Sequence, residues 1–168
     1  LKGGDGYIFG LGGEEAQALA LANIAFTVIP GITSAQGAAA SVGIPLTHRD
    51  YSRALIFATG HLRENKQVDL DWDTLARPNQ TLVIYMGIGT LPMICKQLIA
   101  HGLAPNTPAA LIERATTQAE RCVVGSVQSL PDLAIEQAIK PPALIVIGEV
   151  VGLRETLMHH QPETIAIA

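Results

Sequence analysis

The feature that most constrains the fold of this 168-residue chain is a series of short apolar runs, each ending in glycine, proline or a polar residue. Near-continuous runs rich in β-branched residues are typical of strands that are buried on both faces of a mostly parallel sheet covered by helices. Six such runs are predicted to be strands: Ala25–Ile29, Ala54–Thr59, Thr81–Met86, Ala109–Ile112, Cys122–Val127 and Ala143–Ile147.

Helical patterns lie between these runs. The predicted helices are Glu14–Asn23, Ser34–Val42, Leu91–His101 and Pro131–Ile139, with a short turn of helix near Asp71–Ala76. Small hydroxyl residues precede three of them and are expected to act as N-caps, and glycine is expected to stop one; these are Thr33 or Ser34, Thr90, Ser129 and Gly102. The alternation predicts an α/β fold with a mostly parallel or mixed sheet.

The composition limits the classes of function. Apolar residues make up 48% of the chain and charged residues 15%, which favours a buried core over disorder. The net charge of −4 argues against bulk attraction to nucleic acid or to an acidic membrane surface, so local arginines must meet any anionic ligand. Cys95 and Cys122 lie in apolar runs without C-x-x-C spacing, which indicates core thiols of a cytoplasmic protein and no metal site. The longest apolar stretch, 143–153, is too short to cross a bilayer.

Six of the first fifteen residues are glycine, and a helical pattern follows at once. Because glycine loses the most backbone entropy on folding, such a cluster predicts a loop that turns sharply and lies against a ligand, although a flexible turn is the alternative. The run Gly10-Leu11-Gly12-Gly13-Glu14-Glu15 does not fit a dinucleotide fingerprint, because its sixth position is glutamate and no apolar strand precedes it. We therefore expect a small ligand other than NAD.

Small and polar residues also follow the predicted strands. In open α/β sheets, ligands bind beyond the carboxyl ends of the strands, where small residues leave room and hydroxyls offer hydrogen bonds. The segments in question are Gly31-Ile32-Thr33-Ser34, Gly60-His61, Tyr85-Met86-Gly87, Glu113-Arg114-Ala115-Thr116 and Gly148-Glu149.

Taken together, these segments resemble one family. The matching runs are Lys2-Gly3-Gly4-Asp5, Phe9-Gly10-x-Gly12-Gly13-Glu14-Glu15, Ile29-Pro30-Gly31-Ile32-Thr33-Ser34, Gly43-Ile44-Pro45-Leu46-Thr47-His48-Arg49-Asp50, Thr59-Gly60-His61, Tyr85-Met86-Gly87 and Gly148-Glu149-Val150-Val151. In order and spacing they are similar to the uroporphyrinogen-III C-methyltransferases of the tetrapyrrole methylase family. The resemblance covers essentially the whole chain.

The resemblance implies an architecture. The family has two α/β domains that hold S-adenosylmethionine in the cleft between them, usually in a homodimer. By this match residues 1–50 are the C-terminal part of the first domain and residues 51–168 the second. We expect the chain to be an N-terminally truncated fragment, because the family's leading glycine-rich loop and its acid/base residues have no counterpart in it.

The resemblance also implies site residues. Those that match cofactor contacts are Gly3, Gly4, Asp5, Ile8, Thr33, Ser34, Met86 and Ala115. Those that match contacts to the tetrapyrrole are Glu14, Arg49 and Met86, and an arginine suits a substrate that carries eight carboxylates. The match assigns no catalytic residue and no metal ligand.

The implied reaction is C-methylation of uroporphyrinogen III. A pyrrole carbon attacks the sulfonium methyl twice, giving precorrin-2 for sirohaem, cobalamin or haem d1 and leaving S-adenosylhomocysteine. Two positions depart from the family pattern: Gly6 replaces a proline, and Leu11 replaces an arginine proposed to act on the substrate. Leu11 and the truncation keep open the alternative of a non-catalytic paralogue that binds tetrapyrrole or cofactor without methyl transfer.

Overall fold

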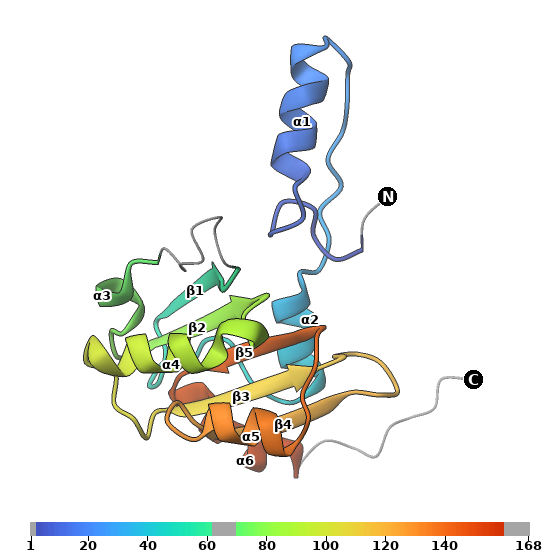
Figure 1. Ribbon diagram of the computed structural model, residues 1–168. Helices are drawn as coiled ribbons and strands as arrows, with labels where there is room; N and C mark the ends of the chain where they lie inside the picture. Colours follow the sequence, from blue (N-terminus) through green and yellow to red (C-terminus); the bar gives the residue numbers. More distant parts are fainter. Residues whose placement is uncertain (1–2, 62–69, 160–168) are drawn as a thin grey trace.

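The computed structural model of the chain describes residues 3–61 and 70–159. In these ranges the chain forms five strands with helices between them (Figure 1). The strands are β1 (Ala54–Thr59), β2 (Gln80–Tyr85), β3 (Pro108–Glu113), β4 (Arg121–Ser126) and β5 (Ala143–Ile147). The α-helices are α1 (Gly12–Leu21), α2 (Ser34–Ser41), α3 (Trp72–Leu75), α4 (Leu91–Ala100), α5 (Leu130–Glu136) and α6 (Arg154–Met158), and the 3-10 helices are η1 (Ile88–Thr90) and η2 (Glu149–Leu153).

The strands form one mixed sheet in the order β1-β2-β5-β3-β4. Only β1 and β2 are parallel; β2 with β5, β5 with β3 and β3 with β4 are antiparallel. The expectation of an α/β fold with a mixed sheet is confirmed, whereas a mostly parallel sheet is wrong. The apolar runs are continuous because helices cover both faces of the sheet. Antiparallel strands that are covered on both faces have the same continuous apolar pattern as parallel ones.

Alternate residues of each central strand enter two separate cores. In β2, Leu82 and Ile84 pack with α4 and α5 on one face. Val83 and Tyr85 face the other side, where α2 and η2 cover the sheet. The side-chain period of two along a strand therefore places the residues from Leu82 to Tyr85 in the two cores by turns, and the tight packing fixes the carboxyl end of β2 beside the start of α2.

The helix boundaries agree with the pattern to within a few residues. Thr90 and Ser129 occupy N-cap positions, although neither side chain caps its helix, and Gly102 follows α4 with a φ of 101°. The short helix α3 begins after Asp71, whose carboxylate accepts a hydrogen bond from the Thr74 backbone N–H at 3.2 Å. Gly102 thus ends α4 in a backbone conformation that favours glycine, and Asp71 is the N-cap of α3.

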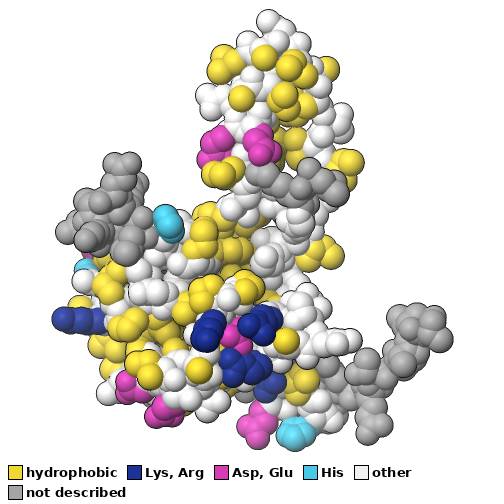
Figure 2. Space-filling view, turned by 45° about the vertical axis from the view of Figure 1, so that its right-hand side comes forward, with side chains coloured by type: hydrophobic (Ala, Val, Ile, Leu, Met, Phe, Trp, Pro, Cys, Tyr) yellow, Lys and Arg dark blue, Asp and Glu magenta, His cyan; other side chains and the backbone are white. Residues whose placement is uncertain are grey.

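The predicted strand Ala25–Ile29 is wrong within the described residues. This segment returns from α1 along the arm, defined as residues 3–32, which projects from the sheet-containing body (Figure 1). A strand needs a hydrogen-bonded neighbour, and no strand of the described sheet pairs with this segment. Its apolar side chains lie open, with Ile29 85% exposed, and Figure 2 shows hydrophobic side chains over the surface of the arm.

None of the helices in the described ranges has the length and apolar character needed to span a bilayer.

Candidate functional site

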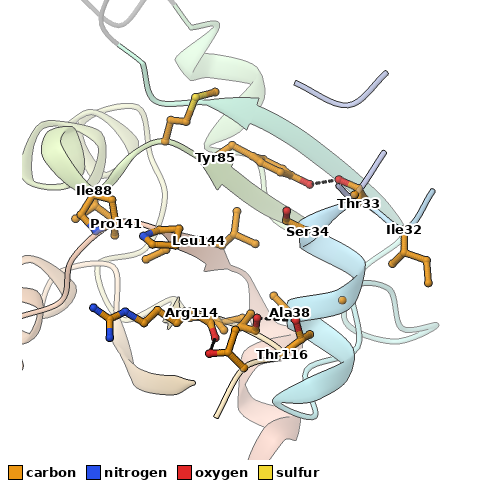
Figure 3. A pocket seen from close by; sticks show the side chains of 18 of the residues that line it. Ile32, Thr33, Ser34, Ala38, Tyr85, Ile88, Arg114, Thr116, Pro141 and Leu144 are labelled. Atoms are coloured by element: carbon orange, nitrogen blue, oxygen red, sulfur yellow. Dashed lines mark hydrogen bonds between the residues drawn. The ribbon is translucent and has the colours of Figure 1, made fainter. Parts of the chain in front are cut away.

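A cavity of about 1050 Å³ opens where the arm meets the body. Its walls come from the start of α2, the end of β2, the loop after β3 and the approach to β5 (Figure 3). The lining is mostly apolar, with a few hydroxyls and one guanidinium. The lining includes Gly4, Thr33, Ser34, Gly37, Ala38, Tyr85, Met86, Ile88, Arg114, Ala115, Thr116 and Leu144.

Most of the predicted cofactor residues lie around this cavity. Gly4, Thr33, Ser34, Met86 and Ala115 line it together, although they come from four separate stretches of the chain. Their convergence depends on the sheet. Met86 follows β2 and Ala115 follows β3, and the two positions are nearly thirty residues apart in the sequence.

Other predicted residues lie elsewhere. A neighbouring hollow of about 440 Å³ is lined by Asp5, Ile8 and also Thr33, so Thr33 lies between the two spaces. Gly3, Glu14 and Arg49 line neither of the two. Glu14 is exposed in the first turn of α1, and Arg49 is exposed in the turn before β1. Their roles remain predictions.

The glycine-rich loop is held by the carboxylate of Asp5. Oδ2 accepts a hydrogen bond from the Gly31 N–H at 3.1 Å, and Oδ1 accepts one from the Tyr7 N–H at 2.8 Å. These bonds, the one from Gly31 foremost, hold the pKa of Asp5 below its usual value. Gly4 has a φ of 75°, which glycine adopts without strain. Asp5 therefore joins the two crossing segments of the arm at the edge of the cavity.

Tyr85 lines the cavity, and sequence reasoning assigned it no role although it lies in the predicted segment Tyr85-Met86-Gly87. Its hydroxyl shares a hydrogen bond with Thr33 Oγ1 at 2.6 Å and accepts one from the Ala35 N–H at 3.1 Å (Figure 3). The expected cap by the Thr33 side chain is therefore wrong, because its hydroxyl is engaged by Tyr85. The N-terminal N–H groups of a helix need acceptors, and a residue from β2 supplies one to α2.

The ring of Tyr85 also connects the arm to the sheet. It lies 4.8 Å from the Phe9 ring and 5.8 Å from the Phe57 ring, measured between centroids. The only signal in the sequence is a tyrosine at the end of an otherwise aliphatic run, where a hydroxyl needs a partner if the ring is buried.

We expect Tyr85→Phe to lower the free energy of unfolding by about 1–2 kcal/mol, because Thr33 and the Ala35 N–H lose a buried partner while the ring contacts remain. Urea denaturation followed by circular dichroism measures this difference. Tyr51→Phe, at an exposed tyrosine, is the matched control and should leave the midpoint unchanged. Equal midpoints for the two variants would contradict the proposed cap.

The wall opposite Tyr85 is the loop after β3. Arg114 and Thr116 have positive φ values of 48° and 63°, a region that non-glycine residues seldom occupy. The Arg114 N–H donates to the Pro142 carbonyl at 3.0 Å, which ties the loop to the chain entering β5. The exposed guanidinium of Arg114 contributes positive charge to the cavity lining.

The base of this loop is fixed by Glu113, which is only 3% exposed. Its Oε1 accepts the Lys140 N–H at 2.8 Å, and its Oε2 accepts Nε of Arg121 at 2.6 Å. The bond from Lys140 is the largest cause of a pKa below the usual glutamate value, and Arg121 adds to it against the opposing effect of burial. Cationic side chains gather around an acidic one on the face drawn in Figure 2.

The chemistry available at the site is that of binding and orientation. Within the described ranges no group of three or more His, Cys, Asp or Glu residues could hold a metal ion; of the pair His159-His160, the second lies outside those ranges. Burial raises the pKa of Cys95 to about 12 and also raises that of Cys122. Both cysteines are free thiols, as predicted, and protonated at neutral pH.

Comparison with known proteins places this geometry in a family. The model of the Tetrapyrrole (Corrin/Porphyrin) Methylases matches residues 1–131. A siroheme synthase of Thioalkalivibrio sulfidiphilus is 54% identical over 164 residues, which are 98% of this chain and 33% of that protein. A siroheme synthase of Nitrosospira multiformis is also 54% identical, over 97% of this chain and 34% of that protein. The chain thus spans about a third of the length of these relatives.

Solved structures agree. A uroporphyrin-III C-methyltransferase from Thermus thermophilus, complexed with S-adenosylhomocysteine, is 37% identical with a TM-score of 0.77, over 91% of this chain and 66% of that one. Another structure of the Thermus thermophilus uroporphyrin-III C-methyltransferase is 42% identical with a TM-score of 0.78, over 97% and 67%. The resemblance that the motifs predicted is confirmed at the level of the family: the chain belongs to the tetrapyrrole (corrin/porphyrin) methylases.

Proposed function

We propose that the protein catalyses the S-adenosylmethionine-dependent C-methylation of uroporphyrinogen III to precorrin-2, and that this chain supplies one side of the cofactor cleft. The observation that carries the proposal is the convergence of Gly4, Thr33, Ser34, Met86 and Ala115 on one cavity. The S-adenosylhomocysteine complex of the Thermus thermophilus relative and the siroheme synthase relatives support it.

The residues around the cavity fit the proposed cofactor. A volume of about 1050 Å³ accommodates a nucleoside joined to an amino acid. Met86, Ile88 and Leu144 offer apolar surface for a base and a thioether, while Thr33 and Ser34 offer hydroxyls. S-adenosylmethionine supplies a methyl group that its sulfonium already activates, so these side chains have to align it and exclude water.

The proposal extends to the substrate and the domains. Uroporphyrinogen carries eight carboxylates, and we assign Arg49 to pairing with them and Glu14 to orienting the macrocycle, in keeping with the family resemblance. We assign residues 1–50 to the end of a first α/β domain and residues 51–168 to a second. The exposed apolar side chains of the arm support the assignment of residues 3–32 to the first domain, because folded proteins seldom leave such side chains open together. A homodimer and a cytoplasmic location complete the proposal.

We expect Asp5→Ala to weaken S-adenosylhomocysteine binding by the intact protein about tenfold, since the N–H groups of Tyr7 and Gly31 lose their hydrogen bonds to a charged acceptor. Isothermal titration calorimetry measures the change, and Asp132→Ala, at an exposed aspartate of α5, is the control. An affinity for S-adenosylhomocysteine unchanged by Asp5→Ala would argue against the proposed site.

One observation favours a second candidate, a paralogue that binds tetrapyrrole or cofactor without methyl transfer. Leu11, at the family's arginine position, is 64% exposed at the start of α1, and it can neither pair with a carboxylate nor move a proton. Incubation of the intact protein with radiolabelled S-adenosylmethionine and uroporphyrinogen III separates the two candidates. Label in the tetrapyrrole excludes the paralogue, and binding without labelling excludes the methyltransferase.

A further inference from the structure

The loop between β3 and β4 adopts a backbone that its own residues do not favour. Thr116 is β-branched and has a φ of 63°, and Arg114 has a φ of 48°. Side chains beyond glycine are disfavoured in this region, and branching at Cβ makes the conflict worse. Hydrogen bonds must therefore hold Ala115 and Thr116 against the cavity.

Two of the bonds that hold this loop are made by a carboxylate at its far end, that of Glu120. Glu120 Oε2 accepts a hydrogen bond from the Thr116 N–H at 2.6 Å and another from Ser41 Oγ, also at 2.6 Å. Ser41 is the last residue of α2, whose opposite end carries Thr33 and Ser34. A single oxygen atom thus joins the loop to the helix.

The two joined elements are facing walls of the cavity. Gly37 and Ala38 of α2 and Ala115 and Thr116 of the loop all line it. Figure 3 shows Thr116 lying beside Ala38 on the flank of α2. A Cβ added at Gly37 would meet Thr116 Cγ2 at 3.6 Å, an ordinary contact distance, so the gap between the walls here is about the width of a methyl group. Glu120 itself does not line the cavity.

We infer that Glu120 is a positioning residue, which sets the separation of α2 and the 114–117 loop and thereby the affinity of the cavity for its ligand. This inference rests on the proposed function for the identity of the ligand. Its physical basis is that hydrogen bonds to an ionised acceptor are short and strong, so one carboxylate can hold a disfavoured backbone in place. The Glu120 side chain acts through Thr116 and Ser41 and makes no contact with reacting atoms.

The test uses three variants of the intact protein. Glu120→Ala removes the acceptor, Glu120→Gln keeps a neutral oxygen at the same place, and Ser41→Ala removes only the donor on α2. S-adenosylhomocysteine is the probe in isothermal titration calorimetry, and the KM for S-adenosylmethionine and kcat are measured in the methyl-transfer assay. Hydrogen exchange of the 114–120 segment is followed without ligand, and Glu136→Ala, at an exposed glutamate, is the matched control.

We expect Glu120→Ala to raise the Kd for S-adenosylhomocysteine and the KM about tenfold with kcat unchanged, and to speed exchange in the 114–120 segment. Glu120→Gln should restore most of the affinity, and Ser41→Ala should have an intermediate effect. Wild-type affinity and exchange in Glu120→Ala, or a Glu120→Gln protein as weak as Glu120→Ala, would overturn the inference. If the wild-type protein does not bind S-adenosylhomocysteine, the proposed function fails, whereas the exchange measurement still tests whether Glu120 holds the loop.

Discussion

Gly31→Ala is expected to abolish binding at the cavity, raising the Kd for S-adenosylhomocysteine by about a hundredfold or more. A Cβ at Gly31 would lie 1.9 Å from the carbonyl oxygen of Gly4 and 2.8 Å from its carbonyl carbon. Both atoms are backbone, so no side-chain rotation relieves the overlap. The loop must move by more than 1 Å, which breaks the bond between the Gly31 N–H and Asp5.

This effect is local to the crossing of the two arm segments, and the chain offers a matched control. Gly13, in the first turn of α1, has nothing within 4 Å of an added Cβ. Gly13→Ala should therefore bind with unchanged affinity and gain slightly in stability, since alanine favours a helix by up to about 1 kcal/mol over glycine. Calorimetric titration of both variants measures the contrast. Tight binding by Gly31→Ala would show that the loop does not need the close crossing.

The second large effect is expected at Glu113, where Glu113→Ala should lower the free energy of unfolding by about 2 kcal/mol and the Tm by about 6 °C. Glu113 is the last residue of β3. Its carboxylate accepts hydrogen bonds from Arg121 of β4 and from the Lys140 N–H before β5, so it connects three strands of the sheet. Removing it leaves the Lys140 N–H without its acceptor and Arg121 without its charge partner. The Tm of Glu113→Ala, measured by thermal unfolding, tests this prediction. Glu136→Ala, at an exposed glutamate, is the matched control and should leave the Tm unchanged.

The same carboxylate predicts a pH dependence with a definite sign. Its pKa lies below the ordinary value of 4.5, so the folded state favours the charged form. Its contribution to stability is therefore complete above about pH 4.5 and is lost as the pH falls through the pKa of the folded state. Glu113→Gln should be less stable than wild type at pH 7, and the difference should shrink below pH 4.5. Parallel stability curves from pH 7 to pH 3 would contradict this assignment.

The fold could be predicted well where local chemistry decides it. The runs 54–59 and 143–147 are strands with the predicted bounds, and every residue of the second run packs into one of the two cores of the sheet. The direction of the strands could not be read from the same runs. Burial on both faces leaves no alternation to distinguish parallel from antiparallel pairing, and β5 inserts between β2 and β3 with the opposite direction.

The site was predicted only in part, for a physical reason. Gly4, Thr33, Ser34, Met86 and Ala115 belong to recognisable segments, and they line one cavity. The roles of Tyr85 and Glu120 follow from no local pattern, although Tyr85 lies in a recognised segment, because each acts on a residue far along the chain: Tyr85 on Thr33 and Glu120 on Ser41. Such partners become neighbours only through the order of the strands.

By itself, the sequence determined what each residue could do locally: which runs must be buried, where helices start and stop, and which segments are small enough to approach a ligand. Tertiary structure decided what these segments meet. Side-chain periodicity and backbone propensity depend on neighbours a few residues away, whereas the cavity depends on contacts that span 50 residues or more, such as Tyr85 with Thr33 and Ser41 with Glu120. The arm shows the same distinction. Its sequence is apolar and predicts burial, but it does not indicate which surface its side chains pack against.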